Sequence, residues 1–446
     1  MGGREEHMKN KLIGILIVML LITPILPVVT SIEKKDPDVL STSRWKETET
    51  HSINPKIKEI IEKINITLVR EFMESLVVDI GNRETGTEGC KEAATYIFEQ
   101  FDSRGLQTRY QNWSSWGSHI YTGFFRSQNV IGTHPGINPQ ADELIILNAH
   151  YDTIKDIVGA VDNAAGTVVV LAAAYVLSQY SFNRTIDFVA FSGEEKGLLG
   201  SHAYARALYD QRTPVLVEFN AEMLAKATSA QTGKTIRLSL TEDAGWIADT
   251  MKTMSQDYGL NFTISQFEVI QRDAKSGWSD YFEFTQLGYE ALAVWPGEWD
   301  PLMHTPQDDM SNVNFSYLVN TTRHVVATIA ILADMKIEQP QLSITNPRFG
   351  TIVRSDTDEK LYKYKTPILL DQTTITLDVT PGSYPIENVA FYVDYRLLFT
   401  DTEPPYEYLL SNLALGFHTI DVIASDTSGT TATDEIKILN INIQKN

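Results

Sequence analysis

The spacing of hydrophobic residues changes twice along this chain. An apolar run extends from Leu12 to Val29. From Ile57 onward, apolar residues recur at helical spacing and alternate with short apolar runs, which indicates amphipathic helices between buried strands. Beyond Asp334 the helical spacing stops, and short β-rich runs are separated by turn residues. The pattern therefore predicts an N-terminal apolar segment followed by two folded domains of different class.

The first folded domain is predicted over residues 57–337. Strands are expected at 144–147, 186–191, 215–219 and 291–295, and helices at 167–177, 244–258 and 317–333. Strands that alternate with helices form mostly parallel sheets with helices on both faces. We therefore expect an α/β fold here. Over residues 338–446 the short strands and frequent turns predict an all-β sandwich.

Residues 1–31 have the features of an export signal, because Lys9 and Lys11 precede the apolar run. The run is barely long enough to cross a bilayer and contains two prolines, so a cleaved signal and a retained anchor are both consistent with it. Residues 32–56 are polar and are predicted to be a linker. Either form predicts an extracellular or cell-surface protein. The N-terminal segment and the β-sandwich are its two candidate tethers to a membrane or surface.

Composition narrows the classes of partner. The 446 residues are 43% hydrophobic and 21% charged, as in ordinary globular proteins. Acidic residues outnumber basic ones by 57 to 37, which gives a formal charge of −20. Such a surface repels phosphate backbones, so nucleic acid is not expected as a partner. The single cysteine, Cys90, excludes an internal disulfide.

Histidines and carboxylates follow the predicted strands, at the edge where open α/β sheets build their sites. They are His150, Asp152, Asp162, Glu194, Glu195, Glu222 and His304. Taken singly, each has an ordinary explanation as a surface charge, a core pair or a helix N-cap. Together, imidazoles and carboxylates without thiolates are the ligands of a catalytic zinc or a similar divalent ion. They exceed the three protein ligands of one open tetrahedral site, whereas two metals that share a carboxylate would use them.

In this order the motifs resemble metallopeptidase family 28, the co-catalytic zinc exopeptidases. The matching pieces are the turn at 83–89, AHYDT at 149–153, DNAAG at 162–166, GEEKGLLGS at 193–201, NAEM at 220–223, WSDYFEF at 278–284 and HTPQDD at 304–309. The resemblance spans roughly residues 57–336 and implies the zinc exopeptidase fold with two Zn²⁺ per chain. The strands after residue 338 are similar to the immunoglobulin-like modules of secreted prokaryotic proteins.

The resemblance also implies a role for each site residue. His150 and Glu222 would bind one metal, Glu195 and His304 the other, and Asp162 would bridge them. Glu194 matches the general base, which takes a proton from an activated water. From their spacing, Asp152 is expected to orient the imidazole of His150, and Asp308 either to do the same for His304 or to be an ordinary surface acid.

Two positions depart from the family pattern. Glu222 stands where aminopeptidases of the family usually have aspartate, and Tyr281 stands where many members have histidine. By the same analogy, Tyr281 and three apolar residues, Met223, Trp295 and Met303, are candidates for the pocket that binds the residue next to the cleaved bond. They are equally consistent with plain core positions.

These observations predict a secreted two-zinc exopeptidase, most simply an aminopeptidase, that acts on peptides. Three alternatives stay open at this point. A carboxypeptidase of the same family would read the other terminus of the substrate. A glutaminyl cyclase-like acyltransferase would use one zinc on the same fold, and a non-catalytic surface-binding protein would use the fold without its chemistry.

Overall fold

A computed structural model describes the following residues: 53–117, 122–241, 244–271, 277–336, 339–354, 357–360, 366–411, 413–427 and 429–441. The predicted export signal at residues 1–31 lies outside them. Among the described residues, one helical stretch, Ala160–Leu177, is long and apolar enough to cross a membrane. It is almost wholly buried inside the protein, so it is the core helix of the α/β fold.

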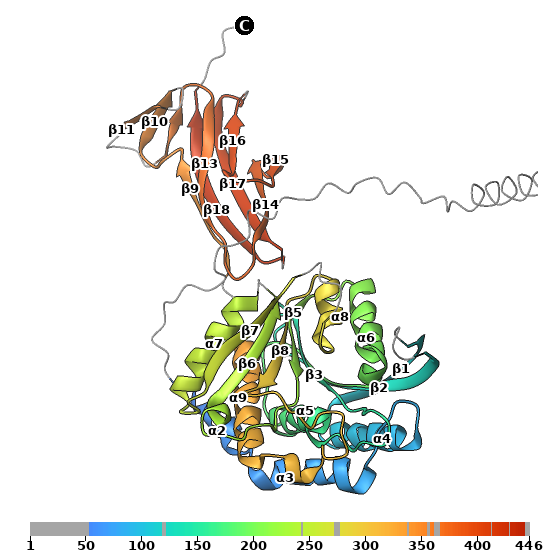
Figure 1. Cartoon of the computed structure of the whole chain (residues 1–446). Coiled ribbons are helices and arrows are strands. Elements are labelled where there is room, and N and C mark those ends of the chain that lie inside the picture. The colour runs from blue at the N-terminus through green and yellow to red at the C-terminus, as the bar shows by residue number, and fades with distance from the viewer. Residues whose placement is uncertain are drawn as a thin grey trace, which may run out of the picture. The chain divides into compact units, whose positions relative to one another are not determined.

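The α/β part is built on one mixed sheet with the strand order β1-β2-β4-β3-β5-β8-β6-β7 (Figure 1). The strands are β1 Gln107–Trp116, β2 Phe124–His134, β3 Leu144–His150, β4 Ile186–Phe191, β5 Val215–Ala221, β6 Thr235–Thr241, β7 Thr263–Ile270 and β8 Ala291–Pro296. The central strands β4, β3, β5 and β8 are parallel neighbours. The pairs β1–β2, β2–β4 and β6–β8 are antiparallel. The predicted α/β class is confirmed.

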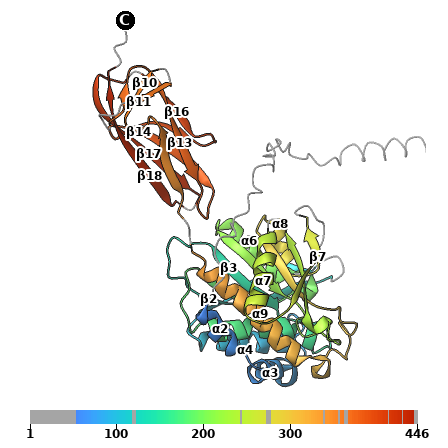
Figure 2. The ribbon, with the colours of Figure 1, turned by 90° about the vertical axis from the view of Figure 1, so that its left-hand side faces the viewer.

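Helices cover both faces of this sheet. They are α2 Pro55–Glu62, α3 Ile66–Glu74, α4 Glu88–Asp102, α5 Ala165–Leu177, α6 Leu199–Asp210, α7 Gly245–Asp257, α8 Tyr281–Gln286 and α9 Phe315–Asp334. Helices α4, α5 and α9 pack on one face, with α2 and α3 outside them, as the second view shows (Figure 2). Helices α6 and α8 pack on the other face. The central strands are therefore buried on both sides, which explains their continuous apolar sequence.

Short irregular turns of helix adjoin the regular elements. A π-helical turn, Ser75–Ile80, follows α3, and another, Ala160–Ala164, leads into α5. Single 3-10 turns are formed by Glu194–Lys196, Thr232–Lys234 and Met310–Asn312. Two of these five turns contain residues of the predicted metal site, Asp162 in one and Glu194 with Glu195 in the other. The chain thus leaves regular structure where the chemistry is expected.

In the described residues from 339 to 441, the regular elements are all strands, as predicted. They are β9 Gln341–Asn346, β10 Thr351–Arg354, β11 Thr357–Lys360, β12 Ile368–Leu369, β13 Thr373–Thr380, β14 Ile386–Val393, β15 Arg396–Asp401, β16 Glu407–Leu410, β17 Gly416–Asp426 and β18 Thr431–Asn440. They form two sheets, β11-β10-β12-β18-β17-β14-β15 and β16-β13-β9. Alternate residues of β17, including Ile420 and Val422, enter a shared apolar core. The boundary at residue 338 and the immunoglobulin-like assignment stay predictions.

Candidate metal centre

The predicted site residues meet at the carboxyl ends of the central strands. His150 is the last residue of β3, two residues separate the end of β4 from the Glu194–Glu195 pair, and Glu222 directly follows β5. The turn after β4 is tight, because Gly193 and Gly197 both have positive φ. A Cβ atom at Gly193 would lie 2.6 Å from the Trp113 ring. Glycine at this position therefore lets the two glutamates turn back over the strand ends.

One group of possible ligands consists of His150, Asp162 and Glu222, which each offer an atom within 4.8 Å of the others. The His150 Nε2 atom lies 3.3 Å from Asp162 Oδ1 and 3.5 Å from Glu222 Oε1. The second Glu222 oxygen accepts a hydrogen bond of 2.7 Å from the Ser279 hydroxyl. The longer glutamate side chain at position 222 therefore still reaches the imidazole and has a fixed orientation.

A second group consists of Asp162, Glu195 and His304. The His304 Nε2 atom lies 3.0 Å from Asp162 Oδ2 and 3.3 Å from Glu195 Oε1. Asp162 thus presents one carboxylate oxygen to each group, as the predicted bridging role requires. His304 is the only one of these ligands that is substantially exposed, at 42% of its side chain.

The residues fit a pair of divalent cations. Burial raises the pKa of Asp162, but hydrogen bonds and charge from His150 and His304 outweigh it and hold that pKa below its ordinary value. Burial and the charge of Asp162 raise the pKa of Glu195 to about 7. Burial lowers the pKa of His150, yet the acids around it, Glu194 first, raise it well above the ordinary value. Two imidazoles are too few to offset these carboxylates, and bound cations would supply the missing charge.

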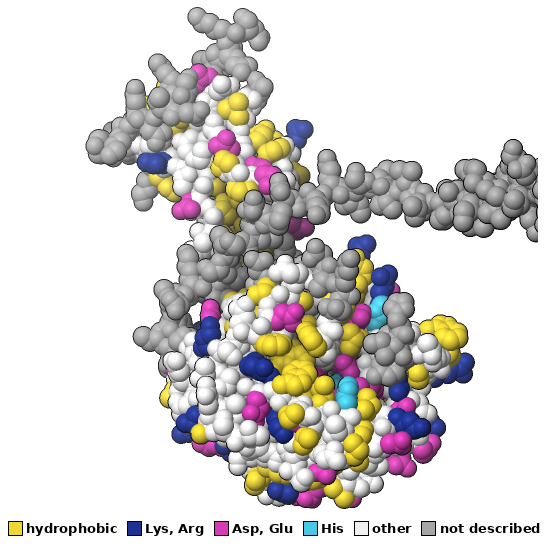
Figure 3. Space-filling view, viewed as in Figure 1, with side chains coloured by type: hydrophobic (Ala, Val, Ile, Leu, Met, Phe, Trp, Pro, Cys, Tyr) yellow, Lys and Arg dark blue, Asp and Glu magenta, His cyan; other side chains and the backbone are white. Residues whose placement is uncertain are grey.

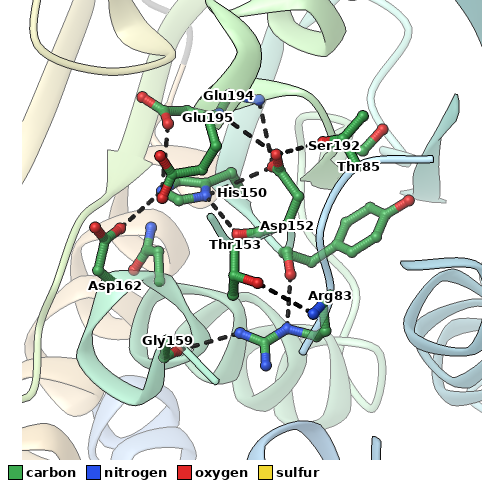
Figure 4. Close-up of polar contacts among 12 residues, drawn as sticks. Arg83, Thr85, His150, Asp152, Thr153, Gly159, Asp162, Ser192, Glu194 and Glu195 are labelled. Atoms are coloured by element: carbon green, nitrogen blue, oxygen red, sulfur yellow. Dashed lines mark hydrogen bonds and ion pairs between the residues drawn. The ribbon is translucent and has the colours of Figure 1, made fainter. Parts of the chain in front are cut away.

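Glu194 lies beside the first group and belongs to neither. One of its carboxylate oxygens is 3.9 Å from His150 Nε2, and 14% of its side chain is exposed (Figure 4). Burial is the main cause of a pKa well above the ordinary value, which His150 lowers and Glu195 raises further. A carboxylate in this position can exchange a proton with a molecule bound at the two groups.

Asp152 is fully buried behind the ligands. Its carboxylate accepts hydrogen bonds from the Thr85 hydroxyl at 2.6 Å and from the backbone N–H groups of Glu194 and Glu195 at 3.3 and 3.4 Å. The His150 Nδ1 atom lies closer to the Asp152 backbone oxygen, at 3.1 Å, than to its carboxylate, at 3.6 Å. Asp152 therefore orients the glutamate turn as well as the imidazole.

Asp308 is not a surface acid, because it is fully buried. Its carboxylate accepts hydrogen bonds from the backbone N–H groups of Val161, at 2.7 Å, and Asp162, at 3.0 Å. Of the two interpretations that the sequence left open for Asp308, its burial rules out the surface acid. It fixes the backbone of the shared ligand Asp162 from the turn that carries His304.

Arg83 is a supporting residue for which the sequence analysis predicted no role. Its buried guanidinium donates hydrogen bonds to the carbonyl oxygens of Tyr151 at 2.7 Å, Val158 at 2.7 Å and Gly159 at 3.1 Å (Figure 4). It also reaches two carbonyls in the preceding turn, those of Leu76 and Gly81. Arg83 thereby joins the end of β3 to the loop before Asp162.

The four candidate pocket residues all contribute to the core. Met223, Tyr281 and Trp295 are almost fully buried, and Met303 is half-buried against the same core. The ring of Tyr281 meets that of Trp295 edge-on, with centroids 6.5 Å apart. Their role in substrate binding stays a prediction.

The comparisons with known proteins agree with this site. Residues 129–329 match the model of peptidase family M28. Over these residues the chain is similar to that family. The predicted resemblance is confirmed, and the M28 match includes all five predicted metal ligands and Glu194.

The curated proteins that this chain resembles include several aminopeptidases. The chain is 28% identical to aminopeptidase YwaD of Bacillus subtilis over 46% of its own length, and 26% identical to aminopeptidase Y of Saccharomyces cerevisiae over 48%. It spans less than half of both relatives, 44% and 40% of their lengths. Leucine aminopeptidase 1 of Trichophyton rubrum is 25% identical and is covered over 75% of its length.

Solved structures share the fold of the M28 domain. BSAP, a zinc aminopeptidase from Bacillus subtilis, superposes with a TM-score of 0.54 at 17% identity, over 61% of this chain and 96% of that one. Bacteroides thetaiotaomicron glutaminyl cyclase superposes with a TM-score of 0.50 at 18% identity, over 60% and 98%. At these identities the likeness concerns the fold, which confirms the predicted zinc exopeptidase fold.

Proposed function

We propose that the chain is a two-zinc aminopeptidase that removes residues from the amino terminus of peptides outside the cell or at its surface. One observation carries the proposal. The Asp162 carboxylate faces two ligand groups at once, while Glu194 stands beside them and belongs to neither. This arrangement matches two neighbouring divalent ions with one free carboxylate available for proton transfer.

His150, Asp162 and Glu222 would hold one zinc, and Asp162, Glu195 and His304 the other. When bound, the zinc pair would polarise the scissile carbonyl and lower the pKa of the attacking water. Glu194 would take a proton from that water and return it to the leaving amine, so that the peptide bond is exchanged for a carboxylate and an amine.

The surrounding residues would keep this geometry unchanged through the reaction. Asp152 holds the backbone of Glu194 and Glu195, and Ser279 holds the Glu222 carboxylate. A preorganised site needs little rearrangement as charge develops, and this is where most of the catalytic advantage of such centres arises.

The test uses purified protein with aminoacyl-nitroanilides and amino-blocked peptides, with and without a chelator. Aminopeptidase action predicts cleavage of the free-amine substrates only, abolished by chelator and restored by zinc. Cleavage of the blocked peptides from their carboxyl end would support the carboxypeptidase alternative. One zinc per chain with cyclisation of N-terminal glutamine would support the acyltransferase alternative.

Substitution of Glu194 tests the base separately from the fold. Glu194→Gln should lower kcat by at least about 100-fold while the metal content, measured by mass spectrometry, stays at two zinc ions per chain. Glu283→Gln is the matched control, because Glu283 pairs with the exposed His202 on α6 and takes no part in the site. A Glu194→Gln protein with wild-type kcat contradicts the assignment of the base.

Export is part of the same proposal and rests on the N-terminal sequence alone. Mass spectrometry of protein secreted by, or attached to, the producing cell would show whether residues 1–31 are removed or retained. Retention with membrane fractionation supports an anchor, and removal supports release or attachment through the β-sandwich. Recovery of the full chain in the cytosol would contradict export.

A further inference from the structure

We propose that Trp278 and Trp299 form an aromatic platform that binds an aromatic side chain of the substrate residue next to the cleaved bond. This inference rests on the proposed aminopeptidase function and adds a substrate class to it. It departs from the names of the leucine aminopeptidase relatives, because the platform selects for a ring and not for a branched aliphatic chain.

Both indoles are exposed, Trp278 at 63% and Trp299 at 41%, whereas Trp113 and Trp295 are buried. The two exposed rings contact each other edge-on, with centroids 6.3 Å apart and an angle of 69°. Exposed tryptophan forgoes a large hydrophobic stabilisation, and adjoining exposed apolar side chains commonly mark a binding surface. Figure 3 shows one face of the molecule on which hydrophobic side chains gather beside acidic and histidine side chains.

Two buried aromatic rings, those of Trp295 and Tyr281, support the platform. Trp299 packs against Trp295 at 6.0 Å, and Trp295 meets Tyr281 edge-on at 6.5 Å. The Tyr281 hydroxyl accepts a hydrogen bond of 3.2 Å from the backbone N–H of Trp278. Each of the four residues therefore contacts two of the others, and these contacts fix the two indoles while leaving them exposed. Tyr281 and Trp295, two of the predicted pocket residues, would act as this support.

Each indole lies in a segment that is linked to one of the proposed metal ligands. Ser279, which follows Trp278, donates the hydrogen bond that orients Glu222. Trp299 precedes the turn that carries His304, where the Met303 N–H bonds to the Asp300 carbonyl. The platform is therefore connected to the centre through the neighbour of Trp278 that orients Glu222 and through the turn that carries His304. A side chain attached to a residue bound at the metals would lie against it.

Two carboxylates flank Trp299 in sequence, Glu298 and Asp300. Indole faces attract cations as well as rings, and a carboxylate nearby strengthens the attraction for a cation. Asp300 is paired with the buried Lys226 at 3.0 Å and accepts a hydrogen bond from Asn312, and Glu298 accepts a hydrogen bond of 2.9 Å from the Thr228 hydroxyl. An arginyl substrate is therefore included in the test below. Contact with an aromatic ring adds an edge or offset interaction that leucine cannot make, equivalent to about 3- to 10-fold in affinity.

The experiment compares kcat/KM for phenylalanyl, tryptophanyl, leucyl, alanyl and arginyl nitroanilides in the zinc-loaded protein. Wild type should prefer the two aromatic substrates over leucyl by about 3- to 10-fold. Trp278→Ala and Trp299→Ala should each remove most of that preference, and Trp278→Phe should keep part of it. Tyr209→Ala is the matched control, because Tyr209 is an exposed aromatic residue at the far end of α6 and contacts Arg206. It should retain the wild-type preference.

A preference that survives both alanine substitutions overturns the inference, as does a loss that falls mainly on the arginyl substrate. Failure of the proposed function gives a different result, because wild type would then cleave none of the substrates. Saturation-transfer NMR tests the platform independently. It detects the binding of phenylalaninamide and leucinamide to the metal-free protein. Stronger transfer to the aromatic ligand, lost in Trp278→Ala, supports the platform, and equal transfer in both proteins refutes it.

Discussion

Replacement of Arg83 by methionine should destabilise the M28 domain and loosen its metal site together. Methionine fills much of the space but removes all the hydrogen bonds that the guanidinium donates to backbone carbonyls. The carbonyls of Leu76 and Gly159 also accept hydrogen bonds from the backbone N–H groups of Gly81 and Ala164. They therefore keep a partner when the guanidinium is removed. The cost falls mainly on the other three acceptors.

Those three acceptors are the carbonyls of Tyr151, Gly81 and Val158. A buried acceptor that loses its partner costs about 1–3 kcal/mol. The Gly81 and Val158 bonds are only partly buried, so water will replace some of the lost interaction. We therefore expect the free energy of unfolding of metal-free protein to fall by about 4 kcal/mol, a large part of the total for a typical domain.

The assay is urea unfolding of metal-free protein, paired with a zinc titration against a competing chelator. Arg83→Met should weaken zinc binding by about 10- to 100-fold, as loss of a supporting residue does at other metal sites. Arg184→Met is the control, because Arg184 is equally buried and donates to the carbonyls of Leu332 and Met335 at the end of α9. It should lose stability and keep its zinc affinity. An Arg83→Met protein within 1 kcal/mol of wild type, or with unchanged zinc affinity, would refute this reasoning.

Three further predictions concern the supporting residues and the core. Ser279→Ala frees one oxygen of Glu222 and should weaken zinc binding by about 10-fold, measured by chelator competition, with little change in thermal stability. Asp152→Asn weakens the acceptor of the Thr85 hydroxyl and of the glutamate turn, so kcat should fall by about 10- to 100-fold while the protein stays folded by circular dichroism. His324 is fully buried, and burial lowers its pKa from 6.5 to about 3. Between those pH values the unfolded chain takes up a proton that the folded protein does not, so stability should fall with acidification by up to about 1.4 kcal/mol per pH unit. In His324→Leu, the free energy of unfolding measured in urea should lack this dependence on pH. The same pH slope in wild type and His324→Leu would contradict the prediction.

The central strands could be predicted because nearly every residue in them is buried. In β4 and β8 nearly all residues are apolar and all lie in the core, so the sequence shows a continuous run with no competing interpretation. Strand β1 was not predicted, because half or more of its residues face solvent at the sheet edge and its sequence is mostly polar. Its pairing with β2 is what makes it a strand.

The ligands of the candidate site were predictable for a related reason, since each sits at or beside the end of a strand or turn that the sequence marks. The supporting contacts were not. Arg83 reaches carbonyls 68 to 76 residues away, and Ser279 meets Glu222 across 57 residues. No local spacing encodes such contacts, because they depend on how separate elements pack. Asp308 shows the same limit, since the sequence left open whether its carboxylate would support the site or face solvent, and did not indicate the backbone of Asp162 as its partner.

Through Asp308, the positions of the two ligand groups depend on each other. It belongs to the turn that carries His304, yet its carboxylate holds the backbone of Asp162, the residue that both groups share. A displacement of that turn, whether by a substrate or by a substitution, would therefore move a ligand of each ion at the same time. The two ions would then bind and dissociate as a coupled pair, and a change of turn length that was meant to alter one of them would alter both.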